Sequence, residues 1–219
     1  MIAVVDYCKG NLKSVERGLR SVGGDASITD DPAVIAQAEA IVLPGVGAFK
    51  DASDTMMTTG QMQAIRDTLS RGVPFLGICL GEHLLFSDGT EGSEEGKTAA
   101  GLGIISGVVD RLPDTDDTGV RYKVPHVGWN SVEFDSSTIK ETCPLMEGIK
   151  SGEYFYFTHS FCAPESDCTR ATTTHSITFP SIVRAGEYIY GVQFHPEKSS
   201  DAGAAVLKNF LNIVKRSQA

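Results

Sequence analysis

The amino-acid sequence predicts an α/β fold built on an open, mostly parallel twisted sheet, with helices on both faces and additional antiparallel strands in the C-terminal half. Up to Phe86, short apolar segments typical of buried strands alternate with amphipathic helical segments. From Ile104 onward the segments are short and β-rich, and an amphipathic helical pattern closes the chain. In sheets of this kind the active site lies at the carboxyl ends of the parallel strands.

The first half of the chain alternates between strand and helix. Residues 2–7 are a mostly apolar run, as in a buried parallel strand, and residues 9–11 form a turn before an amphipathic helix. The glycine-rich stretch from Pro44 to Phe49 predicts a turn that ends a strand. Residues 84–86 continue one apolar helix face after Cys79. The predicted strands lie at residues 26–28, 40–43 and 73–76, and the predicted helices at residues 12–22, 32–38 and 51–69, the last with a break near Gly60.

The second half begins with a stretch of different character. Residues 87–103 are rich in Gly, Ser, Glu and Thr, which predicts a surface loop. The β-rich segments beyond this stretch are expected to extend the sheet with antiparallel strands. They lie at residues 104–112, 131–134, 154–161, 171–174, 181–184 and 188–194, and a closing helix is predicted at residues 201–214.

Length, charge and cysteine content limit the classes of function. We expect residues 1–219 to form a single domain, because one well-buried core of this size is ordinary. The formal net charge of -9 argues against a nucleic-acid or anionic-membrane partner, since phosphate binding depends on clustered Lys and Arg. Five scattered cysteines without a CxxC pair predict neither a disulfide framework nor a metal site, and no cofactor is expected. With no apolar run near 18 residues and no leader, we expect a cytoplasmic protein.

The residue that organises the chemistry is Cys79. It stands where an apolar strand turns into a helix, with Gly77 and Gly81 two residues to either side. A sharp strand-to-helix elbow needs small residues at these positions while the nucleophile occupies a strained backbone conformation. The helix start would activate a thiol and offer backbone N–H groups to an oxyanion. The alternative interpretation is a small buried apolar residue, as most free cysteines are.

A cysteine nucleophile needs a base, and the base needs a partner that fixes its tautomer. His195 closes the apolar strand 191–194 and is followed by Pro196 and Glu197, which places an imidazole and a carboxylate together at a strand end. Taken alone, this pair favours a weak, exposed ion pair in a surface turn. Together with the elbow, it predicts a Cys-His-Glu triad of Cys79, His195 and Glu197.

Several motifs resemble those of the class I, or triad, glutamine amidotransferases. Three carry the family resemblance: Gly77-Ile78-Cys79-Leu80-Gly81, Pro44-Gly45-Val46-Gly47, and Gln193-Phe194-His195-Pro196-Glu197-Lys198-Ser199. Three more resemble, over essentially the whole chain, the members that act as glutaminase subunits in histidine biosynthesis: Val5 to Leu12, Val124 to Asn130, and Tyr156 to Phe161.

The resemblance implies a role for each matched residue. Cys79 would attack the carboxamide of L-glutamine, His195 would act as general base and acid, and Glu197 would orient His195. The oxyanion would be held by backbone N–H groups of Leu80, Val46 and Gly47. Substrate binding would involve five residues: Gly45, His83, Glu95, Ser160 and Phe161, of which Glu95, in the Ser93 to Gly96 stretch, would meet the substrate ammonium.

The resemblance also implies a protein partner. In the family, the released ammonia passes through an internal channel to a (β/α)8 barrel cyclase, and 219 residues hold no such barrel, so a heterodimer is expected. Trp129, Asn130 and Lys198 match positions that face that partner. A buried Trp in the core and a solvated Lys are the structural alternatives.

The chain departs from the family pattern near the nucleophile. Gly81-Glu82-His83 replaces the usual Gly-Met-Gln, and the family's glutamine hydrogen-bonds the substrate. Glu82 is expected to point toward solvent or the partner, since a carboxylate facing the thiol would oppose thiolate formation. Cys8 replaces a glycine, which suggests a negative φ or an altered backbone. A few extra residues precede Ser93.

Three alternative functions share this triad. A paralogous amidotransferase would supply ammonia for amidino-sugar synthesis in surface polysaccharides, and Glu82-His83 would mark such a branch. A regulatory subunit would dock on a barrel after losing glutamine binding at His83. A cysteine hydrolase acting on γ-glutamyl substrates would work without a partner.

Overall fold

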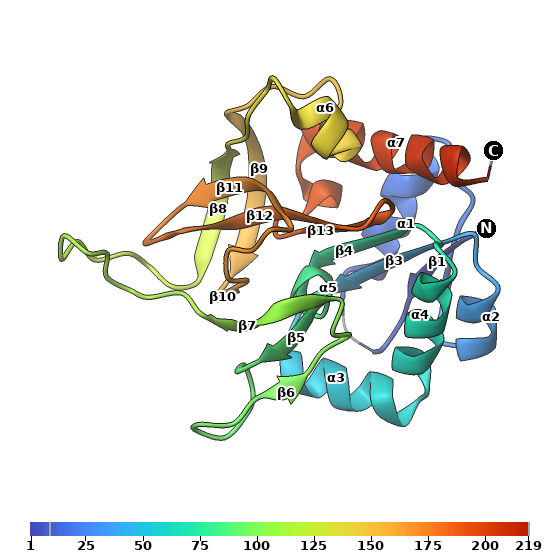
Figure 1. The fold of residues 1–219 in the computed structure, drawn as a ribbon, viewed down its shortest axis with the longest axis horizontal. Coiled ribbons are helices and arrows are strands. Elements are labelled where there is room, and N and C mark those ends of the chain that lie inside the picture. Colours follow the sequence, from blue (N-terminus) through green and yellow to red (C-terminus); the bar gives the residue numbers. More distant parts are fainter. Residues whose placement is uncertain (9, 219) are drawn as a thin grey trace.

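A seven-stranded sheet organises the computed structural model, which describes residues 1–8 and 10–218 (Figure 1). Its strand order is β11-β12-β13-β4-β3-β1-β2. The strands are β1 (Ile2–Val5), β2 (Ala26–Thr29), β3 (Ala40–Gly45), β4 (Phe75–Cys79), β11 (Thr169–Thr174), β12 (Thr178–Ala185) and β13 (Ile189–Val192). Lys9, in the turn predicted before the first helix, lies outside the described residues.

Parallel pairing dominates this sheet. β2, β1, β3, β4 and β13 pair parallel in that spatial order, while β12 pairs antiparallel with both β13 and β11. The register places Gly45 of β3 opposite Cys79 of β4, and Val192 of β13 opposite Ile78. The predicted fold class, a mostly parallel sheet with antiparallel strands added in the C-terminal half, is confirmed.

Helices cover both faces of the sheet, so its strands are buried on both sides. Ile2 and Val4 of β1 belong to one apolar core together with side chains of α1 and α7, whereas Ala3 and Val5 belong to a second core with side chains of α2, α3 and α4. Figure 1 shows these two groups of helices on opposite sides of the sheet. The helices are α1 (Leu12–Ser21), α2 (Pro32–Ala36), α3 (Phe49–Thr58), α4 (Gln61–Ser70), α5 (Leu80–His83), α6 (Ile139–Thr142) and α7 (Ser200–Ser217), with 3-10 turns η1 (Pro144–Met146) and η2 (Pro196–Lys198).

Two smaller sheets lie on the side toward which the arrows of β3 and β4 point (Figure 1). One has the order β10-β7-β5-β6, and the other is the antiparallel pair β8-β9. Their strands are β5 (Phe86–Gly89), β6 (Ala99–Ala100), β7 (Ile105–Arg111), β8 (His126–Val132), β9 (Glu153–His159) and β10 (Phe161–Cys162). These two sheets border the region beyond the carboxyl ends of the parallel strands, where the active site was expected.

Three local predictions are wrong. β3 does not end before the glycine-rich turn, because Pro44 and Gly45 still pair with Ile78 and Cys79 of β4. The helix after Cys79 ends at His83, and Phe86 begins β5 instead of continuing an apolar helix face. Residues 87–103 are not a plain loop, since they hold most of β5 and all of β6.

The second half does not simply extend the main sheet. Only β11, β12 and β13 join it, and β13 does so in parallel. The break predicted near Gly60 is confirmed, since α3 ends at Thr58 and Gly60 has a φ of 81° before α4. Among residues 1–8 and 10–218, no helix is long and apolar enough to cross a membrane.

Candidate active site

Cys79 occupies a strained elbow between β4 and α5. It is the last residue of β4, with φ 53° and ψ -109°, and α5 begins at Leu80. A Cβ atom on Gly77 would lie 2.3 Å from the Gly81 carbonyl oxygen, and one on Gly81 would lie 1.7 Å from the Leu43 carbonyl oxygen. Only glycine avoids both collisions, so the two flanking glycines let the turn close this tightly. A positive φ at a non-glycine residue is the strain that a nucleophile elbow stores.

His195 and Glu197 follow β13, the strand next to β4. The His195 Nδ1 atom lies 3.0 Å from Glu197 Oε1, and the two side chains are 3% and 1% exposed. The carboxylate accepts this hydrogen bond, so Nδ1 carries the proton and Nε2 is left to act on the nucleophile. Burial lowers the pKa of His195, but the adjacent Cys79 and Glu197 outweigh it and raise the pKa to about 10. A buried pair of this kind is not the exposed surface turn that the sequence left open.

The Cys79 thiol touches two further groups. Its Sγ atom lies 3.9 Å from the Thr158 carbonyl oxygen on β9, and 3.7 Å from Nε2 of Gln193, which is fully buried. The buried Nε2 atom of His195 has no hydrogen-bond partner of regular geometry, and the adjacent Cys79 is, with Glu197, one of the two groups that raise the pKa of His195. The sulfur is therefore surrounded by one imidazole, one amide and one carbonyl.

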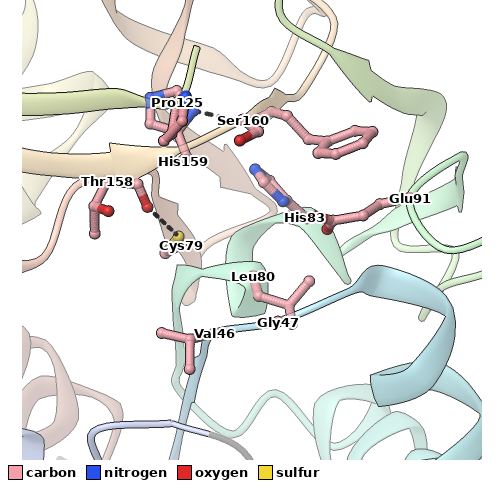
Figure 2. A pocket seen from close by; sticks show the side chains of 11 residues that line it. Val46, Gly47, Cys79, Leu80, His83, Glu91, Pro125, Thr158, His159 and Ser160 are labelled. Carbon is pink, nitrogen blue, oxygen red and sulfur yellow. Dashed lines mark hydrogen bonds between the residues drawn. The ribbon is translucent and has the colours of Figure 1, made fainter.

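A cavity of about 240 Å³ opens above Cys79. Figure 2 shows Val46, Gly47 and Leu80 on one side of it, and Thr158, His159 and Ser160 on the other. Phe161 and His83 also line it. Six of the eight predicted substrate or oxyanion positions outside the triad therefore meet at one cavity with the thiol at its floor: Val46, Gly47, Leu80, His83, Ser160 and Phe161.

Gly45 does not line this cavity. It ends β3, and a Cβ atom there would lie 1.8 Å from the hydroxyl oxygen of the buried Tyr7. Its glycine identity is thus explained by packing against Tyr7. The next residues are placed differently, since the Val46 side chain is 41% exposed and Gly47 has a φ of 101°. The loop between β3 and α3 carries these two residues to the cavity.

The carboxylate that reaches the cavity is Glu91 and not Glu95. Glu91 lines the cavity, and its Oε2 atom accepts a hydrogen bond of 3.2 Å from the Phe49 backbone N–H at the start of α3. Burial raises its pKa above the ordinary value. Glu95 lies on an exposed turn outside the lining. In this structure Glu91, four residues before Glu95, is thus the glutamate that borders the cavity.

Glu82 is buried, contrary to the expectation that it points toward solvent or the partner. Its residue exposure is 0%, and neither carboxylate oxygen has a hydrogen-bond partner. Burial, with a smaller contribution from Cys79, raises its pKa well above the ordinary value. The helix α5, only four residues long, places the Glu82 side chain against Gly191 of β13. A Cβ atom built on Gly191 would lie 2.6 Å from Glu82 Cγ. Burial therefore favours the neutral, protonated form of the Glu82 carboxyl group.

His83 lines the cavity and bonds inward. Its Nε2 atom lies 2.8 Å from Oε1 of Gln193, and its side chain is buried. Burial lowers its pKa to about 4, so the imidazole is neutral.

Cys8, the other departure from the family pattern, has a φ of 65°, and its N–H donates to Asp6 Oδ1 at 2.7 Å. The prediction of a negative φ at Cys8 is therefore wrong. A glycine at this position would adopt the same backbone conformation without strain.

The residues matched to a partner surface lie on and beside the β8-β9 hairpin. Trp129 is 52% exposed, so the buried alternative does not hold. Its ring lies 6.2 Å from that of Tyr156, and Lys198 Nζ lies 5.7 Å from the centroid of the same Tyr156 ring. We call Trp129, Tyr156 and Lys198 the hairpin patch. Asn130 is turned inward instead, and its Nδ2 atom donates to the Thr174 carbonyl oxygen at 2.9 Å.

Sequence reasoning missed Gln193 and Glu91. Gln193 stands in the same motif as His195, two residues ahead, which was the available signal for its proximity to Cys79. Glu91 had no local signal, because only the fold brings it to α3. Within the described part of the chain, no group of three or more His, Cys, Asp or Glu side chains could hold a metal ion.

A parallel sheet with a cysteine at a strand-to-helix elbow, and a buried His-Glu pair at the next strand, defines an α/β enzyme class with a Cys-His-Glu nucleophile site. A model of the family "Glutamine amidotransferase class-I" matches residues 3–214. The chain belongs to the class I glutamine amidotransferase family, and within it to the group of imidazole glycerol phosphate synthase HisH subunits.

Individual relatives support that placement. The imidazole glycerol phosphate synthase subunit HisH of Caldanaerobacter subterraneus subsp. tengcongensis is 45% identical over 217 residues, covering 98% of this chain and 99% of that protein. The subunit HisH of Syntrophotalea carbinolica is 44% identical over 213 residues, covering 96% and 98%. A solved structure of a glutamine amidotransferase shares the fold with a TM-score of 0.71 at 16% identity, covering 98% of this chain and all of that one.

Proposed function

We propose that this chain is the glutaminase subunit that hydrolyses L-glutamine to glutamate and ammonia for imidazole glycerol phosphate synthesis in histidine biosynthesis. The observation that carries the proposal is the buried His195-Glu197 pair beside a strained Cys79 at the floor of a cavity. Relatives named as subunits of imidazole glycerol phosphate synthase match the chain over nearly its full length, which favours this acceptor over an amidino-sugar pathway.

In the first half of the reaction, the Cys79 proton passes to His195 Nε2, and the thiolate attacks the carboxamide carbon of glutamine. Glu197 stabilises the imidazolium through Nδ1, which accords with the raised pKa of His195. The tetrahedral intermediate collapses when its C–N bond breaks, and His195 Nε2–H gives its proton to the departing nitrogen. Ammonia leaves, and a γ-glutamyl thioester remains on Cys79.

In the second half, water replaces ammonia beside His195. His195 takes one proton from the water molecule while the water oxygen attacks the thioester carbon. The C–S bond then breaks to release glutamate. The proton returns from His195 to the sulfur. In both halves, backbone N–H groups of Leu80 and of the Val46-Gly47 loop are the donors proposed for the oxyanion, because both border the cavity next to the thiol.

Glu91 takes the role that the family pattern suggested for Glu95. Its carboxylate borders the cavity, and binding of the substrate's α-ammonium would offset the cost of burying this charge. Ser160 and Phe161 close the cavity opposite the Val46-Gly47 loop, where their backbone groups can hold the α-carboxylate.

Ammonia that reached bulk water would be protonated, so a glutaminase of this kind needs an acceptor site that takes ammonia directly. The names of the relatives state that they are subunits, and we propose a (β/α)8 barrel cyclase as the partner of this chain. The hairpin patch is the proposed contact surface, because exposed aromatic side chains next to a cation are typical of interfaces.

Replacing the nucleophile tests the proposed function. Cys79→Ala removes the only sulfur at the cavity floor among the described residues, and glutamate release in the presence of the barrel partner should fall at least about 10³-fold. The matched control is Cys8→Gly, which changes an exposed thiol outside the cavity and should keep wild-type turnover. Undiminished glutamate release by Cys79→Ala would refute the mechanism.

A further inference from the structure

Three buried side chains form a hydrogen-bonded chain that ends on the nucleophile. The His83 Nε2 atom lies 2.8 Å from Gln193 Oε1, and Gln193 Nε2 lies 3.7 Å from Cys79 Sγ. The exposures of His83, Gln193 and Cys79 are 3%, 0% and 6%. His195, which follows β13, acts on the same sulfur, so Gln193 is a second polar partner of Cys79 that the triad does not include.

The chemistry of the three groups sets the direction of the chain. An amide has one oxygen that only accepts and one nitrogen that only donates. A thiolate can only accept, so Gln193 must turn its nitrogen toward Cys79 once the thiol has lost its proton. The amide oxygen then faces His83, and the short contact requires His83 to carry its proton on Nε2.

We propose that His83 is a positioning residue, which holds the Gln193 amide in the orientation that donates a hydrogen bond to the Cys79 thiolate. Gln193 touches the reacting sulfur, and His83 acts only through it. The inference rests on the proposed function to the extent that a Cys79 thiolate is the nucleophile.

Two observations support this assignment over simple core filling. The imidazole is neutral because burial lowers its pKa to about 4, so it carries one proton and can donate from one nitrogen only. With Nε2–H committed to Gln193, Nδ1 is left bare as an acceptor at the cavity wall. A glutamine at position 83 could also donate to Gln193, but its amide nitrogen would keep a second N–H donor that neutral His83 lacks, so the two residues can both fix Gln193 and present different chemistry to the cavity.

The test is the reactivity of Cys79 toward iodoacetamide in the full-length chain, measured at pH 7 by peptide mass spectrometry. The exposed Cys8 thiol is an internal reference, and the readout is the ratio of the Cys79 and Cys8 alkylation rates. Gln193→Leu should lower this ratio about tenfold, since hydrogen bonds to charged groups are stronger than neutral ones. His83→Leu should lower it severalfold, because the amide loses its orienting donor.

Rescue separates positioning from packing. His83→Gln can still donate to Gln193 Oε1 and should restore most of the wild-type ratio, whereas His83→Asn is one methylene shorter and should not. Circular dichroism checks that each variant is folded, and if His83→Leu does not fold, the Gln and Asn pair decides. A wild-type ratio in His83→Leu or His83→Asn, or no rescue by His83→Gln, would overturn the proposal.

The alkylation ratio does not depend on glutamine turnover. If the variants keep the wild-type ratio while Cys79→Ala abolishes glutamate release, only the role of His83 fails. If Cys79→Ala keeps releasing glutamate, the proposed function fails, whatever the ratio shows.

Discussion

At the scale of single residues, Glu82 is an ionisable side chain buried in surroundings that disfavour its charged form. A carboxyl group with 0% exposure and two unpartnered oxygens stands where the family pattern has methionine. Burial raises its pKa well above the ordinary value of 4.5, so the folded protein keeps a proton that the unfolded chain releases. The corresponding stability is fully present below about pH 4.5 and is lost as the pH rises through the folded-state pKa.

We therefore expect Glu82→Met to stabilise the protein, by about 1–3 kcal/mol at pH 8, because an unsatisfied polar group leaves the interior. The gain should shrink at pH 5, where less of the unfolded chain is ionised. Urea unfolding at the two pH values measures both effects. Glu95→Met, at an exposed position, is the matched control and should change neither value. An equal dependence of stability on pH in wild type and Glu82→Met would show that Glu82 does not carry this proton.

The residue scale also shows what the sequence could and could not reveal. Cys79, His195 and Glu197 were predictable because each is fixed by its own strand end, and neighbouring strands bring strand ends together. Glu82 was misplaced because a helix of only four residues does not keep the solvent-facing side that a longer helix would have. Glu91 was missed because its position depends on a contact with α3, which lies far from it in sequence.

At the scale of elements, α3 and the turn that holds Glu91 are tied together. Glu91 accepts from the Phe49 N–H with its side chain and from the Lys50 N–H with its backbone oxygen, at 3.2 and 3.1 Å. Both donors belong to the first turn of α3, directly after the loop that carries Val46 and Gly47. One carboxylate thus borders the cavity over Cys79 and accepts from the first turn of the helix that follows the proposed oxyanion loop.

The two roles of Glu91 can be separated by substitution. Glu91→Gln keeps an oxygen that can accept from Phe49 but removes the charge, so KM for glutamine should rise about tenfold with kcat changed little. Glu91→Ala removes the acceptor as well, and kcat should also fall, because the first turn of α3 beside the loop loses this contact. Initial rates of glutamate release over a range of glutamine concentrations measure both constants. Glu95→Gln should match wild type, and a raised KM in that variant instead would return the ammonium site to Glu95.

Element boundaries followed from local sequence only where local forces decide them. The break at Gly60 was predictable, because glycine there adopts a φ of 81° between two helices. The extension of β3 through Pro44 and Gly45 was not, since pairing with β4 overrides the turn tendency of these residues. β5 and β6 were not predicted for the same reason: β5 pairs with β7 outside the polar, glycine-rich stretch, and β6 forms by pairing with β5.

At the scale of the whole molecule, the β8-β9 hairpin connects the proposed partner surface with the cavity. Trp129 and Tyr156 face outward from its middle, while Thr158 and His159 at the end of β9 line the cavity over Cys79. The Nδ1 atom of His126 on β8 lies 3.0 Å from the Nε2 atom of His159 on β9. This hydrogen bond joins the two strands beside the cavity. A partner that binds the hairpin would therefore act on groups directly next to the nucleophile.

Trp129→Ala tests this arrangement. The side chain is 52% exposed, so the melting temperature of the isolated chain should change little. If Trp129 lies in the proposed interface, its loss should weaken binding of the proposed barrel subunit by about 2 kcal/mol, or roughly thirtyfold in Kd. Calorimetric titration with the purified barrel subunit measures that Kd, and glutamate release measures the coupled activity.

The control for Trp129→Ala is Met57→Ala, which removes a side chain with 49% exposure from α3, an element outside the hairpin. Its binding should equal that of wild type. If both variants bind the proposed barrel subunit with wild-type affinity and Trp129→Ala also keeps wild-type glutamate release with saturating partner, the hairpin patch is not the contact surface. If Trp129→Ala binds normally but glutamate release with saturating partner falls, the hairpin transmits the partner's effect to Thr158 and His159 without contributing to affinity, and the assignment of Trp129 to binding is wrong.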